Sequence, residues 1–288
     1  MIISRLILCG LMSWSYGLNG LNRVWDAEAY LETSKYAKSL ALEIIDQIPW
    51  SGNETVLDVG TGDGLNSSLI ASKIPLGRVV GIDPSHTMID FARAHYPQER
   101  YPNLSFVIGD AVDFQTEARF DIITSFTVLH LVPDPGKALD RFKDLLRPGG
   151  RMYLKFPIED GFAGTLQKTI ELPQWRDRFN SFESGWYFKT KEDYIQYVLD
   201  AGLLPLRIEN QMIDMWYLSR KEMSDAIRCW LPHILILQPD DQERFLNDLF
   251  DLFLAVAPPD SDGTVHHRER LLYVEAMKRH SPSNLSPL

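Results

Sequence analysis

Short apolar runs alternate with amphipathic stretches through the middle of the chain. Residues 55–59, Thr-Val-Leu-Asp-Val, form such a run between Asn53 and Gly60. A run of this length between turn residues is typical of a strand that is buried on both faces of a parallel sheet. The same pattern predicts further strands over 79–82, 104–108, 120–126 and 151–156.

Helix signals separate these strands. Ser85 is a suitable cap for a helix whose apolar face carries Met88, Ile89 and Ala92. Asp134 followed by Pro135 predicts a second capped helix start. Strands and helices in regular alternation predict an α/β fold with a doubly wound, mostly parallel sheet.

The last third of the chain changes this pattern. We expect a sixth strand within 203–217 and a last strand over 270–276. We expect two helical inserts, near 157–190 and 219–262, and we interpret them as a cap over the strand ends. Thr190 with Asp193, and Ser219 with Glu222, resemble capping boxes that start helices.

Composition excludes several classes of protein. The chain has 288 residues, of which 45% are hydrophobic, so it can bury a core without disulfides or metal. Its two cysteines, Cys9 and Cys229, lie far apart, which argues against a disulfide framework or a zinc finger. A formal net charge of −10 argues against nucleic acid as a partner. No apolar run reaches the roughly 18 residues of a membrane span.

A glycine-rich turn follows the first strand. The spacing Gly60-x-Gly62-x-Gly64 places three glycines before a helix, where the backbone can approach an anionic ligand closely. Asp83 ends the second strand about 20 residues later and can accept hydrogen bonds from ribose hydroxyls. Asp110 follows the third strand and suits an adenine amino group. One turn with two acids at neighbouring strand ends predicts a site for a nucleoside cofactor.

The motifs that carry this pattern resemble those of class I S-adenosylmethionine-dependent methyltransferases. They are VLDVGTGDG, GIDPS, GDAVDF, FDIITSFTVLHLVPD and LLRPGGRMYLKF, within about residues 20–160. The resemblance implies a seven-stranded Rossmann-like sheet with a closing hairpin, and S-adenosyl-L-methionine as cofactor. The segment from Trp25 to Tyr30, VLHLVPD and the inserts are similar to the trans-aconitate and juvenile-hormone-acid type of small-molecule carboxyl methyltransferase.

The resemblance also assigns roles to residues of the cofactor site. The glycine turn would hold the methionine portion, Asp83 the ribose, and the third strand end the adenine. Residues implied in cofactor binding are Asp58, Gly60, Thr61, Gly62, Asp83, Pro84, Met88, Asp110, Ala111, Ser125, Phe126 and Tyr30. Met88, Tyr30 and Trp25 equally suit plain packing roles.

The acceptor is expected to be a small molecule, with O-methylation of a carboxylate as the reaction. A carboxylate is ionised at neutral pH and needs no general base. An alcohol acceptor would need one, and His130 is the candidate. We expect Trp25, His130, Trp186, Tyr187 and Trp216 to contact the acceptor. His266 and His267 are adjacent, which is poor chelating geometry, so no metal is expected.

Other interpretations stay open at this point. The chain could methylate a protein or another acceptor, or bind the cofactor as a catalytically silent regulator. If the glycine turn is misread, a nicotinamide oxidoreductase is the alternative, although such enzymes prefer G-x-G-x-x-G and Leu65 occupies the sixth position here.

The two ends of the chain are treated separately from the domain over 21–280. Residues 1–20 have one basic residue, Arg5, before a mostly apolar stretch, which loosely fits a signal peptide. They lack a clean cleavage site, and the cofactor is made inside cells, so we expect a cytoplasmic protein. The tail over 281–288 is expected to be disordered.

Overall fold

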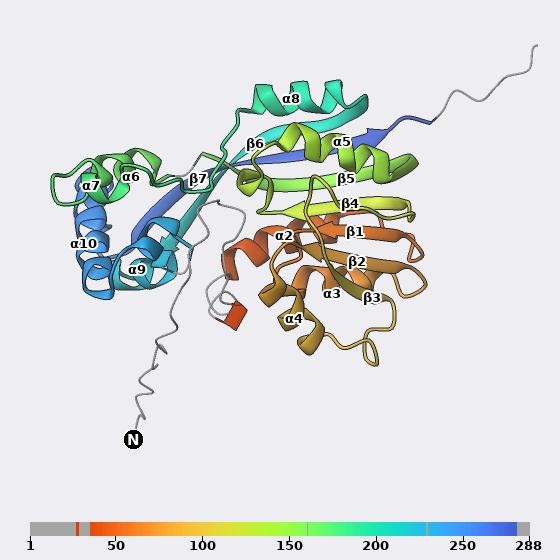
Figure 1. The fold of residues 1–288 in the computed structure, drawn as a ribbon, viewed down its shortest axis with the longest axis horizontal. Helices are drawn as coiled ribbons and strands as arrows, with labels where there is room; N and C mark the ends of the chain where they lie inside the picture. The colour runs from red at the N-terminus through yellow and green to blue at the C-terminus, as the bar shows by residue number, and fades with distance from the viewer. Residues whose placement is uncertain (1–26, 29–34, 160, 229, 281–288) are drawn as a thin grey trace, which may run out of the picture.

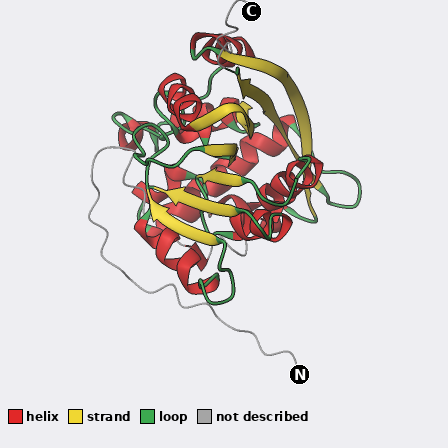
Figure 2. Cartoon of the chain, turned by 90° about the vertical axis from the view of Figure 1, so that its right-hand side faces the viewer, coloured by secondary structure: helices red, strands yellow, loops and turns green. Residues whose placement is uncertain are grey.

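The central element is one twisted sheet of seven strands with helices on both faces (Figures 1 and 2). The computed structural model describes residues 27–28, 35–159, 161–228 and 230–280. Spatial strand order is β3-β2-β1-β4-β5-β7-β6, and only β7 runs antiparallel to its neighbours. The prediction of a doubly wound, mostly parallel, Rossmann-like sheet is confirmed.

The strands and helices of the described residues have the following bounds. The strands are β1 (Thr55–Val59), β2 (Arg78–Asp83), β3 (Leu104–Ile108), β4 (Phe120–Phe126), β5 (Leu146–Glu159), β6 (Leu203–Tyr217) and β7 (Val265–Lys278). The helices are α2 (Lys35–Gln47), α3 (Leu65–Lys73), α4 (His86–His95), η2 (Leu129–Leu131), α5 (Pro135–Leu145), α6 (Ala163–Ile170), α7 (Arg176–Phe179), α8 (Lys191–Asp200), α9 (Arg220–Arg228), η3 (Pro232–Ile236) and α10 (Pro239–Val256).

Helix starts follow the predicted caps. The side chains of Ser85 and Asp134 accept hydrogen bonds from the amides three residues on, and Thr190 with Asp193 forms a full capping box. At α9 the box differs from the prediction. Ser219 accepts from the Glu222 amide, but the Glu222 carboxylate accepts from the amide of Leu218, one residue before the cap.

The structure differs from the predicted strands and helices in two places. β7 extends beyond 270–276 at both ends because it pairs with β6 along its whole length, from Tyr217 opposite Val265 to Leu203 opposite Lys278. The sequence analysis also missed α2. Its buried residues Ala41, Ile44 and Ile45 have helical spacing, and this apolar face could have revealed the helix.

Apolar side chains pack on both faces of the sheet. One cluster joins the strands to α5 and α8, through residues such as Phe142 and Val198. The other joins them to α2, α3 and α4, through Ile45, Ile70 and Ile89. The loops at the carboxyl ends of β1, β2 and β3 are therefore held on a rigid base.

A third cluster forms a separate cap on the far part of the β6–β7 hairpin (Figure 1). Helices α6, α7, α9 and α10 contribute to it, and they fall within the two stretches expected to be helical inserts. Phe162 links the cap to β7, because its ring lies 4.5 Å from Phe253 and 4.3 Å from His267. No helix in the described ranges is long and apolar enough to span a bilayer.

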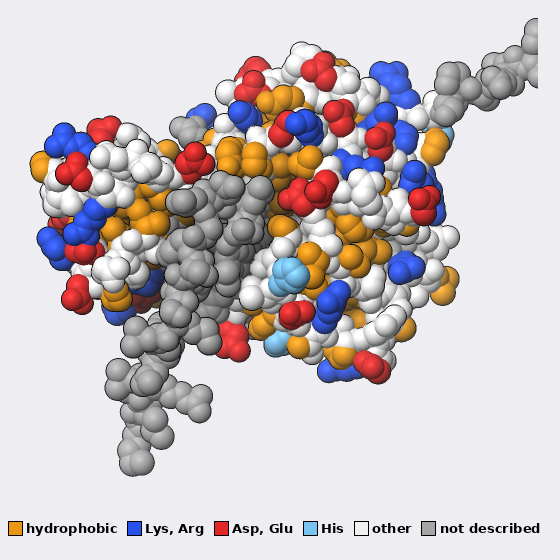
Figure 3. All heavy atoms as spheres, in the orientation of Figure 1, with side chains coloured by type: hydrophobic (Ala, Val, Ile, Leu, Met, Phe, Trp, Pro, Cys, Tyr) orange, Lys and Arg blue, Asp and Glu red, His pale blue; other side chains and the backbone are white. Residues whose placement is uncertain are grey.

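The outer surface of the cap carries charges of both signs (Figure 3). Its arginines pair with acids on neighbouring helices: Arg178 with Asp241, Arg220 with Asp251, and Arg228 with Glu243. The polar faces of these helices therefore point to solvent and their apolar faces point inward.

Candidate functional site

The glycine turn after β1 has a backbone that only glycine adopts easily. Gly60, Gly62 and Gly64 have φ values of 72°, 55° and 86°. A Cβ atom on Gly60 would lie 2.1 Å from Cγ2 of Val128, so no side chain fits there. The amides of Gly60 and Thr61 both donate to the carbonyl of Ile82, at 2.8 and 2.9 Å. These bonds hold the turn against the end of β2.

Asp83 lies at the end of β2 and points to this turn. Its Oδ2 accepts from the amide of Gly62 at 3.1 Å, and its Oδ1 accepts from the amide of Ser85 at 2.9 Å. Burial raises the pKa of Asp83, while the two amides oppose that shift. The predicted pairing of the glycine turn with an acid on the next strand is therefore a direct contact in the structure.

Asp110 lies beside Asp83 on the neighbouring strand end. In the parallel pair of β2 and β3, Asp83 is opposite Ile108, two residues before Asp110. The half-buried Asp110 carboxylate accepts from the Val112 amide at 2.8 Å. Ala111 is buried next to it, Met88 is buried on α4, and Pro84 is exposed in the turn between β2 and α4.

Asp58 is the most buried acid of the site and lies beneath the turn. It is 2% exposed and accepts hydrogen bonds from Ser67 at 2.6 Å and Thr124 at 2.8 Å. Ser67 in turn lies 2.7 Å from the hydroxyl of Thr61. Gly81 leaves the room for this pair, because a Cβ there would be 2.7 Å from the Thr61 hydroxyl. Burial raises the pKa of Asp58 to about 6, although the three hydroxyls lower it.

The sequence analysis missed the hydroxyl partners of Asp58, and it missed Lys38. The ammonium of Lys38 on α2 lies 2.7 Å from Oδ2 of Asp63 in the glycine turn, and the two side chains are 15% and 5% exposed. Oδ1 of Asp63 accepts from the amide of Leu65 at 3.1 Å. The apolar spacing of α2 could have revealed the helix, but not that Lys38 pairs with Asp63. Helix α2 therefore contacts the turn through an ion pair that is largely shielded from solvent.

The end of β4 forms the other wall of the site. Ser125 is buried and donates to the carbonyl of Val59 at 3.0 Å, and Phe126 is buried beside it. Thr127 has a φ of 60° and is the one non-glycine residue with positive φ in the described part of the chain. This left-handed step turns the chain into η2, so that Val128 covers Gly60.

A series of aromatic rings leads from η2 into the cap. His130 is stacked with Phe188 at 6.0 Å, and Trp186 lies 5.8 Å from Phe188 and 5.8 Å from His233. The series also includes Trp230, which is 6.0 Å from Trp186. We call these five residues the aromatic series.

The structure brings together some of the predicted acceptor contacts and leaves others apart. The amide of Tyr187 donates to the carbonyl of His130 at 2.7 Å, which joins the 186–188 segment to η2. Trp216 is 64% exposed on β6, opposite His266, and no described ring contact joins it to the aromatic series. Trp25 and Tyr30 lie outside the described residues, and so do the leader, the tail and both cysteines.

The adjacent histidines of β7 have different surroundings. His266 is held between Asp214 at 3.0 Å and Asp260 at 3.2 Å, and these carboxylates raise its pKa. His267 is buried against Phe162. Across the described ranges no three His, Cys, Asp or Glu side chains are grouped as metal ligands.

Comparison with known proteins identifies relatives over most of the chain. The profile described as "Methyltransferase domain" matches residues 51–202. The trans-aconitate 2-methyltransferase of Methylobacterium radiotolerans is 32% identical over 83% of this chain and 92% of its own. The juvenile hormone acid O-methyltransferase of Drosophila melanogaster is 26% identical over 76% of this chain and 78% of its own.

A solved structure shares the fold at low identity. Phosphoethanolamine N-methyltransferase 2 of Haemonchus contortus, in complex with S-adenosyl-L-methionine, superposes with a TM-score of 0.59 and 17% identity. The match covers 88% of this chain and 57% of that enzyme.

The raised pKa of Asp58 predicts a pH-dependent stability of the ligand-free protein. The folded pKa is about 6, whereas an unfolded chain has about 3.9. The group therefore favours folding below pH about 4, and this contribution is lost as the pH rises through about 6. We expect the free energy of unfolding to fall by about 2–3 kcal/mol from this group over that window.

Urea unfolding of the Asp58→Asn variant checks this expectation. The variant has no charge to bury, so its stability should lack that fall between about pH 4 and about pH 8. Asp113→Asn, which changes an exposed acid, is the matched control. An unchanged pH dependence in Asp58→Asn would show that Asp58 ionises in the folded protein as it does in the unfolded chain.

Proposed function

Because this chain belongs to the methyltransferase domain family and takes S-adenosylmethionine as its cofactor, we propose that it methylates a carboxylate oxygen of a small organic acid. The observation that carries the proposal is the aromatic series. It begins at η2, against the glycine turn, and its two imidazoles are the groups among its rings that could accept a proton. Such a wall suits an acceptor that needs no strong base.

The names of two relatives support an acid as acceptor. One acts on trans-aconitate and the other on juvenile hormone acid, and both names specify carboxylic acids. A carboxylic acid has a pKa near ~4 and is ionised at neutral pH. The oxygen nucleophile is then present before it binds, and the protein need only orient it.

The residues of the site fit the cofactor. We propose that Asp83 accepts the ribose hydroxyls, because its carboxylate is fixed by two amides and remains partly exposed. Asp110, Ala111, Pro84 and Met88 would hold the adenine at the neighbouring strand end. The methionine portion would lie on Gly60, Thr61 and Gly62, above Asp58 and next to Ser125 and Phe126.

The chemistry then depends mainly on orientation. Held by the glycine turn, Asp83 and Asp110, S-adenosylmethionine would supply a methyl group made electrophilic by its sulfonium for transfer to the acceptor oxygen. The chain holds the turn rigid through Asp58 and places His130, Trp186 and Tyr187 around the acceptor. Orientation of this kind can provide effective molarities of roughly 10⁵ M or more. The rings would also exclude water, so that no hydration shell separates the acceptor oxygen from the methyl group.

Turnover with labelled cofactor and matched pairs of small acids and alcohols tests the reaction. We expect transfer to acids as base-labile esters and none to the alcohols. His130→Ala should leave kcat for the best acid within a few-fold, since removing a general base typically costs 10²–10⁴-fold. Preferred transfer to alcohols, with a loss of that size in His130→Ala, would replace the proposal by base-assisted alcohol methylation. Cofactor binding without any turnover would indicate a silent regulator.

Replacing Asp83 tests the cofactor site separately. Asp83→Ala should weaken binding of the cofactor and its demethylated product by on the order of 1–3 kcal/mol, through lost charge-assisted hydrogen bonds. Titration calorimetry measures this change. Asp90→Ala on α4, which removes an exposed acid with 74% side-chain exposure, should bind normally. Equal affinities in the two variants would remove Asp83 from the site.

We expect the two ion pairs of α2 to differ in their effect on cofactor binding. Lys38 pairs with Asp63 in the turn, and Lys73 of α3 pairs with Asp46 of α2 at 2.8 Å. The Lys73–Asp46 pair is open to solvent, since its side chains are 40% and 55% exposed, and it is expected to contribute little to stability. Lys38→Met leaves a buried acid unpaired in the cofactor turn.

Steady-state kinetics of the two methionine variants distinguish the pairs. We expect Lys38→Met to raise KM for the cofactor about tenfold with a smaller change in kcat, and Lys38→Arg to restore most of it. Lys73→Met should stay within about twofold. The same KM in both variants would mean that Lys38 does not position the turn.

A further inference from the structure

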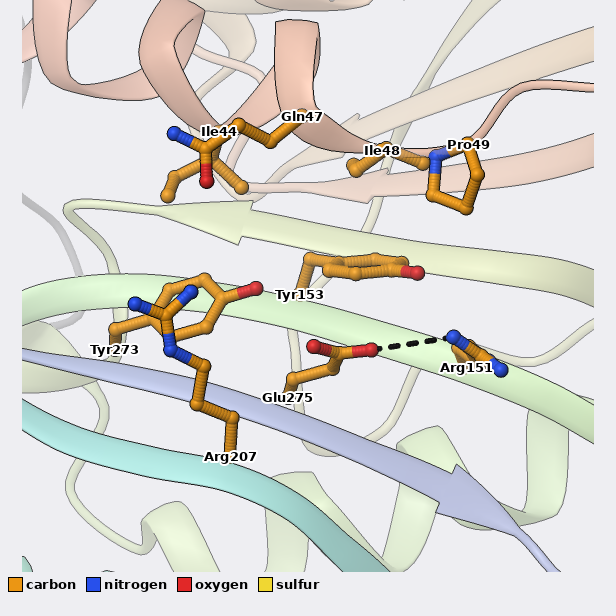
Figure 4. A pocket seen from close by; sticks show the side chains of 9 residues that line it. All are labelled: Ile44, Gln47, Ile48, Pro49, Arg151, Tyr153, Arg207, Tyr273 and Glu275. Atoms are coloured by element: carbon orange, nitrogen blue, oxygen red, sulfur yellow. Dashed lines mark hydrogen bonds and ion pairs between the residues drawn. The ribbon is translucent and has the colours of Figure 1, made fainter.

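A recess lies between the end of α2 and the sheet, on strands β5, β7 and β6 (Figure 4). Its volume is about 130 Å³, well above the ~15 Å³ that one water needs on the same measure. None of its lining residues belongs to the glycine turn, the end of β4 or the aromatic series. It is therefore a second site, separate from the proposed reaction.

The floor of the recess is a row of polar side chains across three strands. Tyr153 of β5 and Arg207 of β6 are both opposite Glu275 of β7. Residues opposite one another share a face of the sheet. Arg151, two residues before Tyr153, adds a guanidinium 3.3 Å from the Glu275 carboxylate. Arg207 is paired with Glu209 of the same strand, so each guanidinium has one acidic partner and keeps further N–H groups to donate.

The hydroxyl of Tyr273 is the unusual group of this floor. Tyr273 is 4% exposed, and its hydroxyl has no hydrogen bond to any described residue. Figure 4 shows this hydroxyl directed into the space between Tyr153 and Glu275. The guanidinium of Arg207 lies 5.0 Å from the Tyr273 ring centre, which fixes the ring in place. The hydroxyl lines the recess, so it can donate a hydrogen bond to a ligand that lies there.

The protonation of this floor determines what such a ligand offers. Burial raises the pKa of Tyr273 and of Tyr153, so both phenols keep their protons at neutral pH and act as donors. The roof is mostly apolar, with Ile44, Ile48 and Pro49 beside the polar Gln47 at the end of α2. The recess therefore presents phenol and guanidinium donors on one side and mostly hydrocarbon on the other.

We propose that this recess binds a small carboxylate, with its oxygens on the Tyr273 hydroxyl and the guanidiniums of Arg151 and Arg207, and its hydrocarbon part under Ile48 and Pro49. Carboxylates accept planar, charge-assisted bonds from guanidinium groups. A molecule of a few heavy atoms fits the volume. The site does not depend on the methyl transfer.

Calorimetric titration of the full chain with acetate tests this site, with acetamide as the uncharged isostere and inorganic phosphate as the other oxyanion. We expect saturable acetate binding, no binding of acetamide and weaker binding of phosphate. Tyr273→Phe keeps the ring and its contact with Arg207 but removes the donor. It should weaken acetate binding at least fivefold, as expected for a hydrogen bond to a charged group.

Two further variants separate this site from the acceptor site and from general effects. Tyr101→Phe makes the same change at a tyrosine outside the recess, and Trp186→Ala disrupts the aromatic series; neither should alter acetate affinity. Acetate binding that is lost in Trp186→Ala but kept in Tyr273→Phe would place the acid in the acceptor site and overturn the proposal. Equal binding of acetamide, tighter binding of phosphate, or no saturable heat would overturn it as well.

Discussion

One buried carboxylate holds together the elements around the glycine turn. Asp58 accepts from Thr124 on β4 and from Ser67 on α3, and Ser67 contacts Thr61 within the turn. A buried charge is tolerated only where hydrogen bonds satisfy it. The hydroxyls therefore have little freedom, and neither has the turn that they support. Burial nevertheless raises the pKa of Asp58, although the hydroxyls lower it, so the buried position of this acid is linked to a cost in stability at neutral pH.

Helix α2 connects this rigid base to the rest of the sheet. Lys38 pairs with Asp63 at the turn, and Glu43 pairs with the buried Lys155 of β5 at 3.2 Å. The end of the same helix forms the roof of the recess over Tyr273. Each of these contacts lies on the face of the sheet that α2 covers. Helix α2, which the sequence motifs do not include, therefore touches both the glycine turn and the proposed carboxylate site.

The long β6–β7 hairpin determines where the cap helices lie. It extends β7 beyond its pairing with β5 and carries the cap helices at its far end (Figure 1). The Tyr187 amide then bonds the cap segment to the His130 carbonyl at η2. The aromatic series, which we propose as the acceptor wall, is consequently built from two regions that are far apart in the chain.

Local sequence determined most of the sheet, the helix caps and the glycine turn of this protein. Apolar runs such as 55–59 and glycines at left-handed positions act through neighbouring residues, so their physics is visible in the chain itself. Asp83 was placed correctly beside Gly62 because parallel strands bring their ends to one edge of a sheet. Only the tertiary structure decided three other features: the ion pair of Lys38, the ring contacts of Trp186 and the position of the Tyr273 hydroxyl. Burial and partner geometry join residues that are distant in sequence, and no local pattern carries that information.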